Sequence, residues 1–96
     1  MQLARVVGTV VSTQKTQQLT GMKLLIVEPV DPRTLESTGK PMVAVDGVGA
    51  GEGEVVLYVS GSSARLTERT KERPVDATIM AIVDFVEVDG RQTFAK

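Results

Sequence analysis

The stretch VAVDGVGAGEGEVVLYVSGSSARL, residues 43–66, joins two short apolar runs through a segment rich in glycine. Within it, glycine occupies every second position from residue 47 to residue 53. A strand could not pack with this pattern, because every second side chain is missing. Glycine is favoured where the backbone is left-handed or lies very close to another group. The pattern therefore predicts a loop between two strands whose backbone closely approaches another part of a protein.

A phosphate-binding loop is the first alternative for such a segment, but its context argues against it. Phosphate loops connect a strand to a helix and carry Lys followed by Ser or Thr. Here a second apolar run follows, no such pair is present, and Glu52 and Glu54 would repel phosphate. The favoured interpretation is a structural or close-contact loop.

Outward from this stretch, short apolar runs alternate with polar segments, as is typical of an all-β domain. Gly8 in the first run predicts a bend, and Pro29 predicts that the second run ends there or is an edge strand. Asp89 and Gly90 predict a two-residue hairpin turn. The expected strands are residues 3–13, 22–30, 42–46, 54–60, 78–88 and 91–95.

The remaining segments are expected to be loops, apart from one helical turn. Residues 62–66 could form this turn, with Ser62 or Ser63 as its N-cap. Residues 31–41 and the charged residues 67–73 lack periodicity and are expected to be exposed. Five or six strands in 96 residues predict a single domain over residues 1–96, a small OB-like five-stranded β-barrel with one short helix.

The longest predicted strand, residues 78–88, has apolar side chains on both faces. One face carries Ile79, Ala81, Val83 and Phe85, and the other carries Met80, Ile82, Val86 and Val88. A strand of this kind is covered on both sides. A barrel of one layer covers only the inner face, so the pattern predicts a helix or another subunit on the outer face.

Composition excludes several classes of function. The chain has no His and no Cys, which removes the commonest general base, the commonest metal ligand and any disulfide. An OB-like barrel could instead bind single-stranded nucleic acid or a peptide. The net charge of -1 and the presence of only three aromatic residues do not fit a nucleic-acid surface, so this binding module is the second choice. The sequence shows neither a signal peptide nor a membrane-spanning run, so the cytoplasm is the expected location.

Two candidate polar sites have simpler interpretations. Ser60, Ser62 and Ser63 have no histidine to activate them, so roles in turns and caps are favoured over nucleophilic catalysis. Three aspartates lie in or beside apolar strands and could bind a cation, but buried charges are usually paired. A structural role is therefore favoured, in which each aspartate pairs with an arginine or caps a backbone N–H. The aspartates are Asp46, Asp76 and Asp84, and the expected partners are Arg5 and Arg65.

Six blocks, in order and covering nearly the whole chain, resemble a known family. They are residues 4–10 (ARVVGTV), 20–25 (TGMKLL), 46–54 (DGVGAGEGE), 61–65 (GSSAR), 74–76 (PVD) and 81–84 (AIVD). Together they resemble the EutN/CcmL family of bacterial microcompartment vertex proteins. The resemblance implies a small β-barrel that assembles into a homopentamer and caps the vertices of a polyhedral shell. It also implies a structural protein without enzymatic activity or cofactor, in agreement with the missing His and Cys.

The resemblance further implies contacts with hexameric and trimeric shell proteins, and a location in the microcompartment shell. The GSSAR block and the near-neutral composition look closer to catabolic shells than to carboxysomes. A ring brings five copies of one segment together at its axis, where missing side chains would prevent collisions. The residues expected at the five-fold axis or the subunit interface are Val48, Gly49, Ala50, Gly51, Glu52, Gly53 and Arg65, with Met80, Ile82, Asp84 and Val86 on an interface strand.

Overall fold

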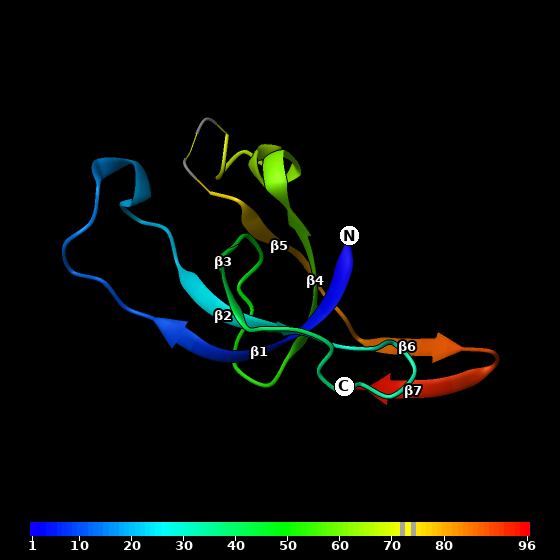
Figure 1. Cartoon of the computed structure of the whole chain (residues 1–96). Helices are drawn as coiled ribbons and strands as arrows, with labels where there is room; N and C mark the ends of the chain where they lie inside the picture. The colour runs from blue at the N-terminus through cyan, green and yellow to red at the C-terminus, as the bar shows by residue number, and fades with distance from the viewer. Residues whose placement is uncertain (72, 74) are drawn as a thin grey trace.

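In a computed structural model, which describes residues 1–71, 73 and 75–96, five strands form a barrel and two form a separate hairpin (Figure 1). The strands are β1 (Gln2–Val10), β2 (Leu24–Pro29), β3 (Met42–Asp46), β4 (Val55–Ser60), β5 (Ala77–Ile82), β6 (Phe85–Val88) and β7 (Arg91–Ala95). Two short 3-10 helices, η1 (Gln17–Leu19) and η2 (Gly61–Arg65), complete the set.

The barrel is closed in the strand order β1-β2-β3-β5-β4. Neighbouring strands are antiparallel except for β3 and β5, which run parallel. The predicted five-stranded barrel is therefore confirmed. Closure also explains the alternation of buried and more exposed residues in β1 and β2, since inward side chains must fill the narrow interior and outward ones face away.

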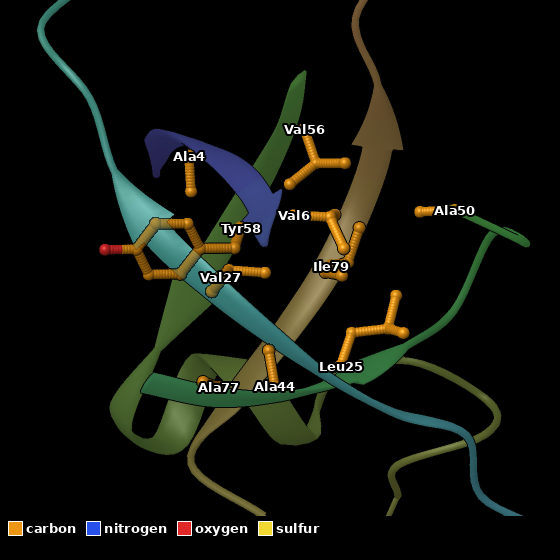
Figure 2. Close-up of a cluster of buried hydrophobic side chains, with 10 residues drawn as sticks. All are labelled: Ala4, Val6, Leu25, Val27, Ala44, Ala50, Val56, Tyr58, Ala77 and Ile79. Carbon is orange, nitrogen blue, oxygen red and sulfur yellow. The ribbon is translucent and has the colours of Figure 1, made fainter. Parts of the chain in front are cut away.

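Small aliphatic side chains and one tyrosine fill the barrel (Figure 2). Ala4 and Val6 of β1 point inward, and Val56 and Tyr58 do so from β4. Tyr58 is the only aromatic residue of this core, and its hydroxyl donates a hydrogen bond to Gln2 Oε1. Burial of this ring raises the pKa of Tyr58. A five-stranded barrel has room for little more, which explains the scarcity of aromatic residues.

Two local features of β1 and β2 follow the prediction. The register between the two strands shifts between Val6 and Gly8, at the mid-strand glycine. A Cβ atom at Gly8 would lie 3.3 Å from Ile26 Cδ1, so the position also leaves room for that side chain. Pro29 is the last residue of β2.

The predicted single strand over residues 78–88 is wrong, because two strands of different sheets occupy it. β5 ends at Ile82, and β6 begins at Phe85 and pairs only with β7. Between them, the Val83 N–H donates to Val55 O at 2.8 Å before the chain leaves the barrel. The apolar residues of this segment are therefore divided along the chain, with those up to Ile82 in the barrel and those from Phe85 in the hairpin.

Part of the outer face of β5 is covered by the chain itself. Thr78 is fully buried and donates a hydrogen bond to Ala64 O of η2 at 2.6 Å. The short helix is present, but the predicted cap is wrong. Ser60 occupies the cap position without a side-chain hydrogen bond, and Gly61, with φ of +68°, begins the turn.

In the segment 67–73, the charged residues Glu68, Arg69 and Lys71 are exposed as predicted, but the threonines are not. Thr70 is fully buried, and its hydroxyl exchanges hydrogen bonds with Thr67. Local side-chain bonds of this kind stabilise a tight turn. Glu72 in this segment, and Pro74 in the PVD block, lie outside the described residues.

The predicted hairpin turn is confirmed, since Asp89 and Gly90 both have positive φ, at 53° and 76°. Two adjacent residues of this kind are typical of a type I′ turn. Polar contacts hold the hairpin to the rest of the chain: Arg33 pairs with Asp89, and the Thr93 hydroxyl donates to Pro32 O at 2.6 Å. The hairpin extends away from the barrel, which fits the extents of 46 × 23 × 21 Å (Figure 1).

Candidate assembly surface

The glycine-rich loop between β3 and β4 is organised by Asp46, the last residue of β3. The buried Oδ1 atom of Asp46 accepts the backbone N–H groups of Val48, Gly49 and Ala50 at 3.0, 3.0 and 3.2 Å. Lys23 lies on the other side, with its Nζ 3.6 Å from Asp46 Oδ2 and 2.9 Å from Ala50 O. One carboxylate therefore fixes the first half of the loop.

A second carboxylate fixes the other half. Glu54 Oε1 accepts the N–H of Gly51 at 2.7 Å, and the Glu54 N–H donates to Gly51 O at 3.2 Å. The loop is also joined to β1, since Gly53 N–H donates to Val6 O at 2.8 Å. Most of the amide groups that a phosphate loop would offer to a ligand are thus occupied by side chains and backbone of the same chain.

Three of the four glycines have reasons within the chain. Gly49 and Gly53 have left-handed backbones, with φ of +80° and +86°. A Cβ at Gly47 would lie 3.0 Å from Ile79 O, so the close approach here is to β5. Gly51 differs, because its φ is ordinary and an added Cβ would make only a 3.6 Å contact with Glu54 Oε1. Only at Gly51 does the chain itself leave the glycine unexplained.

The predicted assembly residues of the loop are not equally available at the surface. Val48 and Glu52 are exposed, whereas Ala50 is fully buried and points into the barrel core (Figure 2). Val48 also lines a hollow of about 300 Å³ together with Met80 of β5. The structure therefore brings together two residues that were predicted separately, one from the loop and one from the strand.

The remaining predicted interface residues lie apart. Ile82 is half-buried against the barrel core, Asp84 is exposed between β5 and β6, and Val86 lies on the hairpin. Arg65 is exposed in η2. Within residues 1–71, 73 and 75–96, no hydrogen bond or ion pair joins Arg65 to the glycine-rich loop.

The predicted pairing of the aspartates is correct only for Asp46, and its partner is wrong. Asp46 is paired with Lys23 rather than with an arginine, whereas Asp76 and Asp84 are exposed. The alternative structural role, capping of backbone N–H groups, is confirmed for Asp46. The signal was an aspartate directly before a turn, where its side chain can accept the amide groups two to four residues ahead.

Ion pairing at the base of the hairpin changes two pKa values. The Lys96 ammonium, 2.9 Å from Glu54 Oε2, lowers the pKa of Glu54, and the Gly51 N–H lowers it further. The hydrogen bond between the Lys96 ammonium and the Glu54 carboxylate also raises the pKa of Lys96. Both shifts favour the charged pair, which joins the end of the hairpin to the loop.

The described residues contain no cluster of metal-binding side chains. Across them, no three His, Cys, Asp or Glu side chains gather where they could hold a metal ion. Ser62 and Ser63 are exposed, and η2 has no side-chain cap. No helix in this part of the chain is both long enough and apolar enough to cross a bilayer.

Comparison with known proteins gives a consistent result over nearly the whole chain. Residues 1–84 match the family described as "Ethanolamine utilisation protein EutN/carboxysome". The carboxysome shell vertex protein CcmL of Gloeobacter violaceus is 44% identical over all of this chain and 95% of its own length. The microcompartment shell vertex protein EutN of Salmonella typhimurium is 46% identical over all of this chain and 96% of its own length.

Solved structures agree with these relatives. The structure of Gloeobacter violaceus CcmL superposes with a TM-score of 0.92 over all of this chain and 98% of its own. The GrpN pentameric microcompartment shell protein from Rhodospirillum rubrum is 45% identical, with a TM-score of 0.80 over 92% of this chain and all of its own. Carboxysome and ethanolamine-utilisation relatives match equally well, so identity does not separate these two types of shell. The chain belongs to the EutN/CcmL family of microcompartment shell vertex proteins.

Proposed function

We propose that this chain is a structural protein that forms a closed pentamer at the vertices of a microcompartment shell. The pentameric GrpN structure carries the proposal, since it is 45% identical and shares the fold over 92% of this chain. The glycine-rich loop also supports it, because most of its amide groups are bonded within the chain and its surface is suited to packing rather than to ligand binding.

In this pentamer, residues 48–53 lie near the five-fold axis or the neighbouring subunit. Val48 and Glu52 provide the exposed side chains of the loop. Gly49, Gly51 and Gly53 have no side chain, so a neighbouring subunit can approach the loop backbone closely. The buried Ala50 contributes by holding the loop to its own barrel. Gly51 supports this placement most directly, because its own chain does not require a glycine there.

The interface continues from the loop onto β5 and the hairpin. Met80, next to Val48 in the shared hollow, is the first contact beyond the loop, followed by Asp84 and Val86 along the chain. Ile82 supports this surface from the barrel side, and Arg65 pairs across or beneath the interface. Residues 1–96 act as one vertex domain.

The pentamer works in the cytoplasm as part of a shell, where it contacts hexameric and trimeric shell proteins. It needs no cofactor and carries out no reaction. A catabolic shell remains our prediction, supported by the GSSAR block. The composition of the operon that encodes the chain would test this assignment, since enzymes of aldehyde metabolism nearby would support it and carboxysome genes would overturn it.

Native mass spectrometry tests the ring directly. A closed ring of five 10.3 kDa chains has a mass of about 51 kDa. Gly51→Leu should reduce the pentamer while the isolated chain stays folded, because its backbone conformation suits any residue. Gly39→Leu is the matched control, since Gly39 is exposed and an added Cβ would also make a 3.6 Å contact. Gly49 is less suitable, because its left-handed backbone would strain any replacement.

Two outcomes would contradict parts of the proposal. Only monomers or dimers of the unaltered chain would overturn the pentamer itself. A normal pentamer of Gly51→Leu would leave the ring intact but remove the loop from the axis and the interface. Nucleic-acid binding is not favoured, because the net charge is -1 and Tyr58 of the barrel core is buried, which leaves Phe85 as the exposed aromatic side chain among the three in the chain.

A further inference from the structure

Two of the three aromatic residues of this protein lie outside the barrel, on the β6–β7 hairpin. Phe85 begins β6 and is 58% exposed, and Phe94 on β7 is half-buried and pairs with Val86. The contacts that hold the hairpin to the rest of the chain are mainly polar, as at Asp89, Thr93 and Lys96. An isolated two-stranded hairpin is marginally stable in water, so its apolar side chains need a covering surface.

A complementary hollow lies on the barrel itself. It has a volume of about 160 Å³ and a largely apolar lining made by residues of η1, β2 and β3, together with Val75, the charged Asp76 and Ala77 at the start of β5. Val43, at 49% exposure, opens it to the surface. A hydrophobic cavity of about 150 Å³ is large enough to hold a benzene ring, so this hollow has the size of a phenylalanine side chain. The lining includes Leu19, Leu24, Val43, Val45 and Val75.

The chain does not fill this hollow with its own hairpin. Phe85 is not among the lining residues, and Figure 1 shows the hairpin extending from the side of the barrel away from η1. The aromatic side chain and the hollow are thus two different surfaces of the same molecule. A head-to-tail interface, the kind that closes into a ring, requires two such different surfaces on every copy.

We propose that Phe85 of one copy inserts into the hollow at Val43 of the next copy around the ring. This inference rests on the proposed pentamer and specifies one of its contacts. The same contact covers the apolar hairpin and the exposed Val43, and five repeats of it leave neither surface free. Buried aromatic side chains at the centre of an interface usually carry much of its binding energy. The hairpin is therefore an arm that holds the neighbouring subunit.

Because the chain contains no cysteine, cross-linking can test the contact cleanly. A variant with both Phe85→Cys and Val43→Cys, treated with a short bis-maleimide, should give a ladder of linked chains up to about 51 kDa. A link within one chain would leave the monomer band, so only contact between copies produces the ladder. The matched control combines Val43→Cys with Val11→Cys, because Val11 is 85% exposed and lies outside the hollow.

A second pair of variants measures the energetic role of the hollow. Val43→Asp should dissociate the pentamer, whereas Val11→Asp should leave it intact, with both chains folded by circular dichroism. Phe85→Ala should raise the protein concentration at which half of the pentamer has dissociated by roughly 30-fold or more, as expected for a residue central to an interface.

The two proposals can fail separately. An intact 51 kDa pentamer without the ladder, and with Val43→Asp still assembled, would overturn the arm and keep the vertex proposal. Absence of the pentamer in the unaltered chain would overturn the vertex proposal itself.

Discussion

The barrel and the hairpin differ in how their apolar side chains are covered. In the barrel, Ala4, Val27, Val56 and Ile79 are almost completely buried by their own chain. In the hairpin, Phe85 is exposed and Val86 and Phe94 are only half-buried. The barrel therefore accounts for the stability of the single chain, whereas the hairpin has apolar surface left for a partner.

This difference separates two kinds of substitution that sequence alone would treat alike. Removing an apolar side chain from the barrel leaves a cavity and destabilises folding. Removing one from the hairpin changes little in the single chain, because no cavity forms, and acts on assembly instead. Variants from the two regions therefore test whether folding and assembly depend on different parts of the chain.

The largest effect on folding is expected in the barrel. Ile79→Ala should lower the free energy of unfolding by about 2–5 kcal/mol, because Ile79 is fully buried. Phe85→Ala should change the unfolding of the disassembled chain by less than about 0.5 kcal/mol. Urea denaturation below the dissociation concentration of the ring measures both. Similar losses in the two variants would show that the hairpin is part of the folding unit, against our comparison.

An intermediate effect is expected where the loop joins the barrel. Asp46→Ala removes the acceptor of three amide groups, of which that of Ala50 is buried, and should cost about 1–3 kcal/mol. Asp46→Asn keeps one oxygen as an acceptor and should recover much of that loss. Thermal unfolding compares the two. If both variants lost the same stability, the contact of the carboxylate with Lys23 would be the dominant contribution instead.

The smallest effect is expected where the hairpin ends, at Glu54 and Lys96. The pKa of Glu54 is lowered, so the pair stabilises the protein above the unfolded Glu pKa of about 4.3 and loses this contribution as pH falls through the folded value. The pKa of Lys96 is raised, so the contribution is complete below about pH 10.4 and is lost as pH rises through the folded value.

NMR titration of the Glu54 carboxyl carbon measures this pair directly. Lys96→Met should move the pKa of Glu54 upward, and Lys96→Arg should leave it low, because an arginine keeps the charge. An unchanged pKa in Lys96→Met would place the cause of the shift at the Gly51 N–H, and the hairpin would then lack this tie to the loop.

Much of the barrel could be predicted from sequence because period-two alternation and turn residues are local signals. Met42–Asp46 and Arg91–Ala95 were predicted with the observed bounds, and the Asp89–Gly90 turn follows from backbone preferences alone. The division of residues 78–88 could not be predicted, because apolar residues continue through Val83 and nothing local shows where the chain leaves the barrel.

The candidate surface was less accessible to sequence reasoning. The glycine pattern indicated a close backbone approach, but the contact that the structure shows is between Gly47 and Ile79 O, within the chain. The pairing of Asp46 with Lys23 joins residues 23 positions apart and depends on the register of β2 with β3. Long-range pairings of this kind leave no local pattern, whereas the blocks shared with a family preserve them.

Closure of the barrel also determines how growth of an assembly is limited. A sheet with free edges can add strands from other molecules without end, and this is a common route to aggregation. All five barrel strands have two paired neighbours, whereas in the described part of the chain β6 and β7 pair only with each other and each keeps an outer edge without a partner strand. A shell component that must stop at five copies benefits from this, because further chains find little backbone to extend.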